Sequence, residues 1–230
     1  MIYFLGYPLV FTLLRLIVRV LGRLKSSGEE NVPARGGVLL CPNHLSDADP
    51  PTLFVTTPRR AWFVGKQELF EIPVLGWFFA RFHAFPIERG SADRAALRRI
   101  EQCLNAGDPV AVFPEGRCSE TGLLQRVQPG AALLALRTGV SIVPVGLQNT
   151  NSLMPYGKLV PRWSPRPVTV TFGKPLRPEA FAHLPRGEAV AALTQALAEA
   201  LADLTHQPPP PAPAPRVRRR SSAKPSAETS

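Results

Sequence analysis

Short apolar runs alternate with longer segments of helical periodicity along most of this chain. Strands are predicted at 38–41, 61–64, 84–87, 110–113, 142–147 and 168–172, and helices at 51–56, 74–82, 92–105, 130–137 and 188–204. Gly107 and Gly139 follow two of the predicted helices, as glycines at helix ends commonly do. This alternation predicts a single α/β domain whose mixed, largely parallel sheet is flanked by helices.

A histidine and an aspartate follow the first predicted strand. His44 and Asp49 stand five positions apart, in a His-x4-Asp arrangement. Imidazole titrates near neutrality, and a carboxylate bound to one ring nitrogen leaves the other nitrogen free to accept a proton. Because α/β sheets place ligands at the ends of their strands, the pair is a candidate general base with the group that orients it.

The same stretch has two other interpretations. Ser46 with Asp49 can form a capping box, or Asp49 alone can cap the following helix, and His44 would then be an ordinary loop residue. Cys41, His44 and Asp47 or Asp49 also carry atoms that zinc accepts as ligands. A structural zinc site needs a second Cys/His pair, which the sequence lacks, so we expect no metal.

Three further stretches decide between these interpretations. They are Phe-Pro-Ile-Glu-Arg at 85–89, Phe-Pro-Glu-Gly-Arg-Cys-Ser at 113–119 and Val-Pro-Val at 143–145. Together with Asn43, His44 and Asp49, they resemble the four blocks of the lysophosphatidate acyltransferase family of glycerolipid acyltransferases, in the family's order and at similar spacing. The resemblance extends over residues 36–151, which we expect to be the catalytic region.

The resemblance implies a function. It implies transfer of a fatty acyl group from acyl-CoA or acyl-carrier protein to the free hydroxyl of 1-acyl-glycerol-3-phosphate, giving phosphatidate for phospholipid synthesis. His44 and Asp49 are then the catalytic residues, while Glu115 and Gly116 belong to the acceptor site. No cofactor is expected beyond the thioester donor. A G-x-S-x-G nucleophile elbow is missing from the sequence, which favours direct attack by the acceptor without an acyl-enzyme.

An acceptor phosphate requires fixed positive charge. Arg89 and Arg117 follow short predicted strands, and we expect both to bind the phosphate, with Lys66 as a third cation. Arg117 stands one position earlier than the arginine usual in the family, and Cys118 takes the usual place. Some relatives that reacylate lysophospholipids carry the arginine early, so another lysophospholipid or lyso-lipid is the alternative acceptor.

The N-terminal segment and the charge point to a membrane surface. Residues 1–27 are largely apolar. A spanning helix requires about 20 consecutive apolar residues, and Arg15 and Arg19 interrupt the apolar run before it reaches that length. We expect a helix lying at the interface, with a short span as the alternative. A net charge of +10 fits anionic lipid and a phosphate-bearing substrate, and a nucleic-acid recognition pattern is missing. The expected location is the cytoplasmic face of the cell membrane.

The remaining segments complete the predicted organisation. Residues 152–206 are expected to finish the domain, and the proline-rich basic tail at 207–230 is expected to be disordered. Three cysteines far apart imply no disulfide framework, which fits a reducing compartment. A catalytically inactive, basic membrane-binding module is the alternative of another class. The joint presence of His44, Asp49 and Glu115 argues against it.

Overall fold

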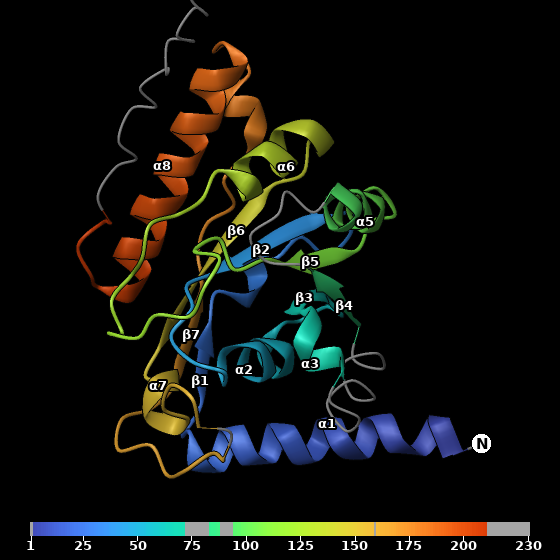
Figure 1. The fold of residues 1–230 in the computed structure, drawn as a ribbon, viewed down its shortest axis with the longest axis vertical. Helices are drawn as coiled ribbons and strands as arrows, with labels where there is room; N and C mark the ends of the chain where they lie inside the picture. The colour runs from blue at the N-terminus through green and yellow to red at the C-terminus, as the bar shows by residue number, and fades with distance from the viewer. Residues whose placement is uncertain (1, 72–82, 88–93, 159, 211–230) are drawn as a thin grey trace, which may run out of the picture.

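The structure is a computed structural model, and it describes residues 2–71, 83–87, 94–158 and 160–210. Seven strands form one sheet within these residues (Figure 1). They are β1 (Lys25–Ser27), β2 (Val38–Pro42), β3 (Trp62–Lys66), β4 (Ala84–Ile87), β5 (Pro109–Ala111), β6 (Ile142–Gln148) and β7 (Thr169–Phe172). Their order across the sheet is β1-β7-β6-β2-β5-β3-β4, and only β6 and β7 pair in antiparallel fashion. The mixed, largely parallel sheet confirms the predicted fold class.

Helices cover both faces of the sheet. They are α1 (Ile2–Leu21), α2 (Asp49–Thr56), α3 (Gln67–Glu71), α5 (Arg94–Asn105), α6 (Gly130–Thr138), α7 (Thr150–Leu153) and α8 (Arg186–Thr205), with 3-10 turns η1 (Glu29–Asn31) and η2 (Pro178–Phe181). Side chains alternate along β2, so Leu39 and Cys41 pack against α5, α6 and α8, whereas Val38 and Leu40 pack against Leu53 of α2. A central parallel strand that is apolar on both faces requires this two-sided cover.

The predicted elements that fall on described residues are present, with ends shifted by at most two residues. The strand predicted at 110–113 ends at Ala111, because Phe113 already accepts a turn hydrogen bond from the Gly116 N–H at 3.1 Å. The helix predicted at 74–82 lies outside the described residues. Strand β1 was not predicted, because its sequence, Lys-Ser-Ser, is exposed throughout and has no apolar pattern.

Helix α1 lies along one end of the domain, next to α2 (Figure 1). Val18 is buried in a cluster with Leu153 and Val168, whereas Leu13 and Leu16 on another side of α1 are more than half exposed. Within the described ranges, no helix combines the length and the apolar character needed to cross a membrane. The expected helix within residues 1–27 is thus present, and its contact with lipid stays a prediction.

Candidate active site

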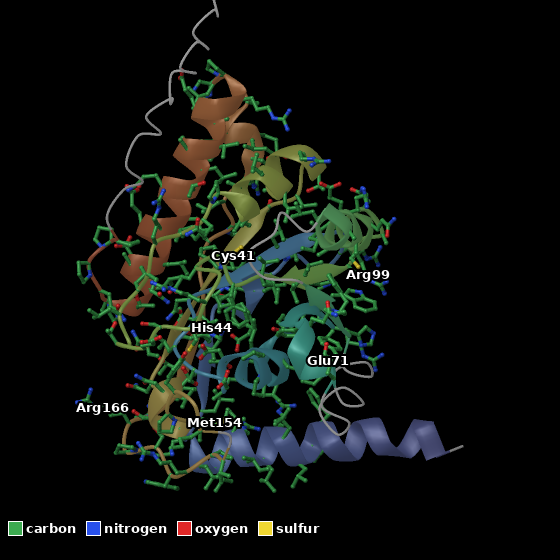
Figure 2. All side chains as sticks on the ribbon, viewed as in Figure 1. Cys41, His44, Glu71, Arg99, Met154 and Arg166 are labelled. Atoms are coloured by element: carbon green, nitrogen blue, oxygen red, sulfur yellow. The ribbon has the colours of Figure 1, made fainter. Side chains whose placement is uncertain are left out.

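The polar residues singled out in the sequence gather where β2 and β5 end. These two strands are parallel neighbours, so their carboxyl ends meet at the same edge of the sheet. His44 follows β2 by two residues, and Glu115 follows β5 by four. Figure 2 shows His44 near the middle of the molecule, among the elements at this edge.

Asn43 joins the end of β2 to β6. Its Nδ2 donates to the Leu147 carbonyl at 3.0 Å, and its Oδ1 accepts from the Leu147 N–H at 2.7 Å. Both residues are fully buried. The amide side chain therefore continues the pairing of β2 with β6 by one step beyond the strand and holds the backbone that carries His44. The sequence marks Asn43 as part of the first block but indicates no role for it, because its partner stands 104 residues away.

His44 and Asp49 form a buried pair. His44 Nδ1 lies 2.8 Å from Asp49 Oδ2, and the two residues are 7% and 0% exposed. The same carboxylate oxygen accepts the backbone N–H groups of Leu45 and Ser46. Because a carboxylate only accepts, Nδ1 carries the hydrogen and Nε2 is the ring nitrogen left to accept a proton. The Phe113 ring stacks on the imidazole at 4.2 Å and further restrains its orientation.

The prediction that Asp49 alone caps the helix is wrong, whereas its predicted pairing with Ser46 is present in part, because the Ser46 N–H donates to Asp49 Oδ2 at 2.9 Å and Ser46 Oγ accepts the Ala48 N–H at 3.0 Å. Helix α2 begins at Asp49 itself, its N-cap residue is Ala48, and it has no side-chain cap bond. Pro50 and Pro51 occupy the first turn, where their missing N–H groups remove no helical hydrogen bond. The Asp49 carboxylate turns back toward His44 instead.

Glu115 links the His44 loop to a second loop. Its Oε1 accepts the His44 backbone N–H at 2.9 Å, and its Oε2 accepts the Gln125 N–H at 3.0 Å. The residue is only 5% exposed, and burial raises the pKa of its carboxyl to about 7, against the lowering effect of these hydrogen bonds. With both oxygens bound to backbone amides, Glu115 holds the main chain at His44 in place.

Gly116 and Arg117 form the exposed tip of the turn after Glu115. Gly116 has φ 75°, a conformation that L side chains rarely adopt, and a Cβ there would touch nothing within 4 Å. Conformation, rather than crowding within the chain, is therefore the reason for glycine. Arg117 Nε donates to Gln125 Oε1 at 2.8 Å, and the structure gives no partner among the described residues to its two Nη groups. The exposed fork of the guanidinium is thus oriented by Gln125.

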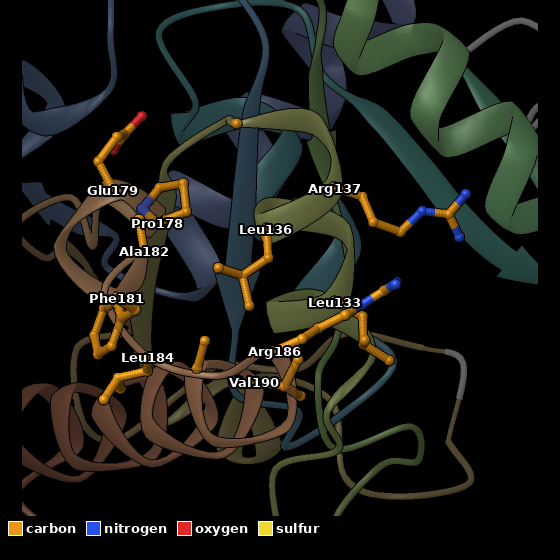
Figure 3. A pocket seen from close by; sticks show the side chains of 12 residues that line it. Leu133, Leu136, Arg137, Pro178, Glu179, Phe181, Ala182, Leu184, Arg186 and Val190 are labelled. Carbon is orange, nitrogen blue, oxygen red and sulfur yellow. The ribbon is translucent and has the colours of Figure 1, made fainter.

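The other expected phosphate-binding residues are only partly described. Lys66 is the last residue of β3, so its backbone also lies at the carboxyl edge of the sheet, but its side chain is outside the described part. Arg89 lies outside the described residues altogether. A groove of about 920 Å³ lies elsewhere, between α6, η2 and α8, and no expected site residue lines it (Figure 3).

The part of the chain that the structure describes contains no cluster of side chains that would support the zinc interpretation. Within it, no three His, Cys, Asp or Glu side chains converge as metal ligands would. Cys41 packs in the hydrophobic core beside Leu39, and burial raises the pKa of its thiol far above its usual range. A thiol in this setting is a core side chain and a poor metal ligand.

Comparisons with known proteins place the chain in a family. The family model described as Acyltransferase matches residues 23–148. A 1-acyl-sn-glycerol-3-phosphate acyltransferase of Bacillus subtilis is 31% identical over 206 residues, which cover 87% of this chain and 98% of the relative. A lyso-ornithine lipid O-acyltransferase of Pseudomonas aeruginosa is 30% identical over 136 residues, covering 59% of this chain and 51% of the relative.

A solved structure has the same fold. The crystal structure of the 1-acyl-sn-glycerophosphate acyltransferase PlsC from Thermotoga maritima aligns with a TM-score of 0.62 at 24% identity, covering 83% of this chain and 79% of that one. The buried His-x4-Asp pair at the end of β2, the family model and the Bacillus relative all agree. The chain belongs to the acyltransferase family.

Proposed function

We propose that this protein is a 1-acylglycerol-3-phosphate O-acyltransferase that makes phosphatidate from lysophosphatidate and an acyl thioester. The observation that carries the proposal is the contact of 2.8 Å between His44 Nδ1 and Asp49 Oδ2, which leaves Nε2 to accept a proton. The Bacillus relative and other relatives, which are named 1-acyl-sn-glycerol-3-phosphate acyltransferases, support the choice of acceptor.

The reaction proceeds by direct attack of the acceptor. His44 Nε2 removes the proton from the hydroxyl as its oxygen bonds to the thioester carbonyl carbon. The carbon–sulfur bond then breaks, and the leaving thiolate receives that proton from the imidazolium. Asp49 keeps Nδ1 protonated and stabilises the positive charge that the ring carries between the two transfers. No cofactor takes part in this sequence of steps.

The acceptor phosphate binds to Arg117. Gln125 holds Nε of the guanidinium, so the Nη groups remain to bind two phosphate oxygens. Lys66 at the end of β3 adds positive charge at the same edge of the sheet, and we expect Arg89 to bind the same phosphate. Glu115 acts as a positioning residue in this scheme, because its oxygens hold the main chain of His44 and of the Gln125 loop.

The enzyme works at a membrane surface. Helix α1 lies at the interface of the cytoplasmic membrane face, and the net charge of +10 attracts anionic lipid rather than nucleic acid. The lysophospholipid acceptor then reaches the site from the bilayer.

Two observations favour a second candidate acceptor, lyso-ornithine lipid. Cys118 stands where the family usually has arginine, and a Pseudomonas relative is named a lyso-ornithine lipid O-acyltransferase. An acceptor without phosphate has less need of Arg117.

A labelled-acyl transfer assay with a panel of acceptors tests the proposal. The purified chain receives acyl-CoA or acyl-carrier protein thioester with lysophosphatidate, other lysophospholipids or lyso-ornithine lipid. We expect phosphatidate to form fastest. Faster transfer to lyso-ornithine lipid would support the second candidate, and no transfer to any acceptor would support the inactive membrane-binding module.

A further inference from the structure

Two segments of the sequence contain basic residues and no acidic ones. Residues 1–28 and residues 121–178 have neither Asp nor Glu, although the chain has 17 such residues in all. The fold brings parts of these segments together: the Ser164 N–H donates to the Leu21 carbonyl, and the Val168 N–H donates to the Gly22 carbonyl, both at 2.8 Å. Figure 1 shows the connection between α7 and β7 beside the carboxyl end of α1. We call its described residues, 154–158 and 160–167, the α7–β7 loop.

Exposed apolar side chains gather on the same two segments. Of the eight large apolar side chains that are exposed in the described part of the chain, six belong to α1 or to the α7–β7 loop. They are Leu13, Leu16, Val20, Tyr156, Val160 and Trp163, each more than half exposed. An exposed tryptophan near other exposed apolar groups is typical of an interaction surface rather than of an isolated surface residue.

The loop holds Trp163 outward. Its neighbour Ser164 is fully buried, and Ser164 Oγ donates to the Arg166 carbonyl at 2.6 Å. Leu153 at the end of α7 and Met154 at the start of the loop pack with Val18 of α1 in one buried cluster. Trp163 is 58% exposed between these anchored positions, so the local fold presents its ring to the outside.

Exposed cations lie on the same two elements as these apolar side chains. The loop contributes the exposed side chains of Lys158, Arg162 and Arg166, and Figure 2 shows Arg166 at the outer edge of the protein. On α1, Arg15 and Arg19 are exposed and four residues apart, so they share one stripe of the helix. That stripe lies beside the exposed stripe of Leu13, Leu16 and Val20, whose spacings of three and four place them together.

We propose that the α7–β7 loop is a second membrane-contacting element, which forms one lipid-binding surface with α1. Tyr156 and Trp163 enter the interfacial region, where amphipathic aromatic rings are favoured, and the cations meet lipid phosphates. The inference extends the membrane association of α1 proposed above.

An anionic bilayer fits this surface better than other partners do. A nucleic acid would match the charge but leave the apolar side chains exposed. A second copy of the chain would cover the apolar groups but bring like charges face to face. A bilayer with anionic headgroups takes up both kinds of side chain at once.

Sedimentation of the full-length protein with vesicles tests the loop. One set of vesicles contains phosphatidylcholine alone and the other also contains phosphatidylglycerol. Replacing both Arg162 and Arg166 by Gln should weaken binding to the anionic vesicles by up to about thirtyfold at low salt, and by less at high salt. Trp163→Ser should weaken binding to both kinds of vesicle. The matched control replaces Arg177 and Arg186 by Gln; Arg177 directly precedes η2, Arg186 begins α8, and the amino end of α8 lies away from α1 in Figure 1.

Brominated lipid provides a readout that does not depend on a loss of binding. It should quench part of the tryptophan emission of the wild-type protein. In Trp163→Phe this lipid-dependent quenching should be lost. Equal weakening by the control pair would overturn the proposal, because the attraction would then be a diffuse effect of net charge. Unchanged quenching in Trp163→Phe, or vesicle binding that none of the loop variants alters, would also overturn it.

Acyl transfer to lysophosphatidate dispersed without vesicles separates this proposal from the proposed function. The loop variants should keep the wild-type rate in that assay, because the loop contributes no group to the chemistry. A wild-type protein that binds vesicles through Trp163 yet transfers no acyl group would refute the proposed function and leave the loop assignment standing.

Discussion

Glu115 gives the protein a pH-dependent stability that a single substitution removes. Burial raises the pKa of its carboxyl from a usual value of 4.5 to about 7. The folded protein therefore binds a proton at Glu115 more tightly than the unfolded chain does, and stability falls as pH rises from about 4.5 to about 7. One pKa unit corresponds to about 1.4 kcal/mol, so a shift from 4.5 to about 7 contributes about 3.5 kcal/mol at most, and this contribution is lost as pH rises.

Urea unfolding at several pH values compares the wild type with Glu115→Gln. The glutamine does not titrate, so the wild type should lose about 2–3 kcal/mol of unfolding free energy relative to the variant between pH 5 and pH 8. Glu120→Gln, which removes an exposed carboxylate from the same loop, is the matched control and should change the pH dependence little. Parallel pH profiles for the wild type and Glu115→Gln would refute the reasoning, since Glu115 would then not titrate in this range.

Three further perturbations test other parts of the account. Asn43→Ala leaves the buried N–H and C=O of Leu147 without their partners, so urea unfolding should show a loss of about 2–4 kcal/mol; a loss below about 0.5 kcal/mol would show that the link is dispensable. Arg117→Ala should lower kcat/KM for lysophosphatidate by roughly ten- to a hundredfold with little change in KM for the thioester, and lysine should restore part of the loss; unchanged acceptor kinetics would make Arg117 a simple loop residue. Deleting residues 2–21 should release the protein from neutral vesicles and leave a salt-sensitive remainder on anionic ones; unchanged sedimentation would contradict the role of α1.

Most of the strands and helices, and the pairing of His44 with Asp49, were predictable because their signals are local. Buried strands such as β2 are short apolar runs between glycine and proline, and His44 and Asp49 stand five positions apart in one turn. That turn also shows the limit of local reasoning. The same residues allowed a helix cap, and only the folded turn shows that the Asp49 carboxylate faces His44.

The contacts between distant parts of the chain could not be predicted from the sequence. Asn43 bonds to Leu147 across 104 positions, and Glu115 bonds to the His44 N–H across 71. The sequence around each residue does not indicate its partner, because β2, β5 and β6 become neighbours only in the folded sheet. The antiparallel pairing of β6 with β7 could not be predicted either, because the apolar pattern of a buried strand does not indicate the direction of its neighbour.

The measurement that tests the central claim most directly is the turnover of His44→Ala with lysophosphatidate and an acyl thioester. His44 lies in a loop beyond β2, so the variant should fold, and urea unfolding checks that it does. Loss of a general base lowers the rate by roughly a hundred- to ten-thousandfold, and we expect a decrease of this size in kcat. A folded His44→Ala protein that makes phosphatidate at a rate near that of the wild type would contradict the account.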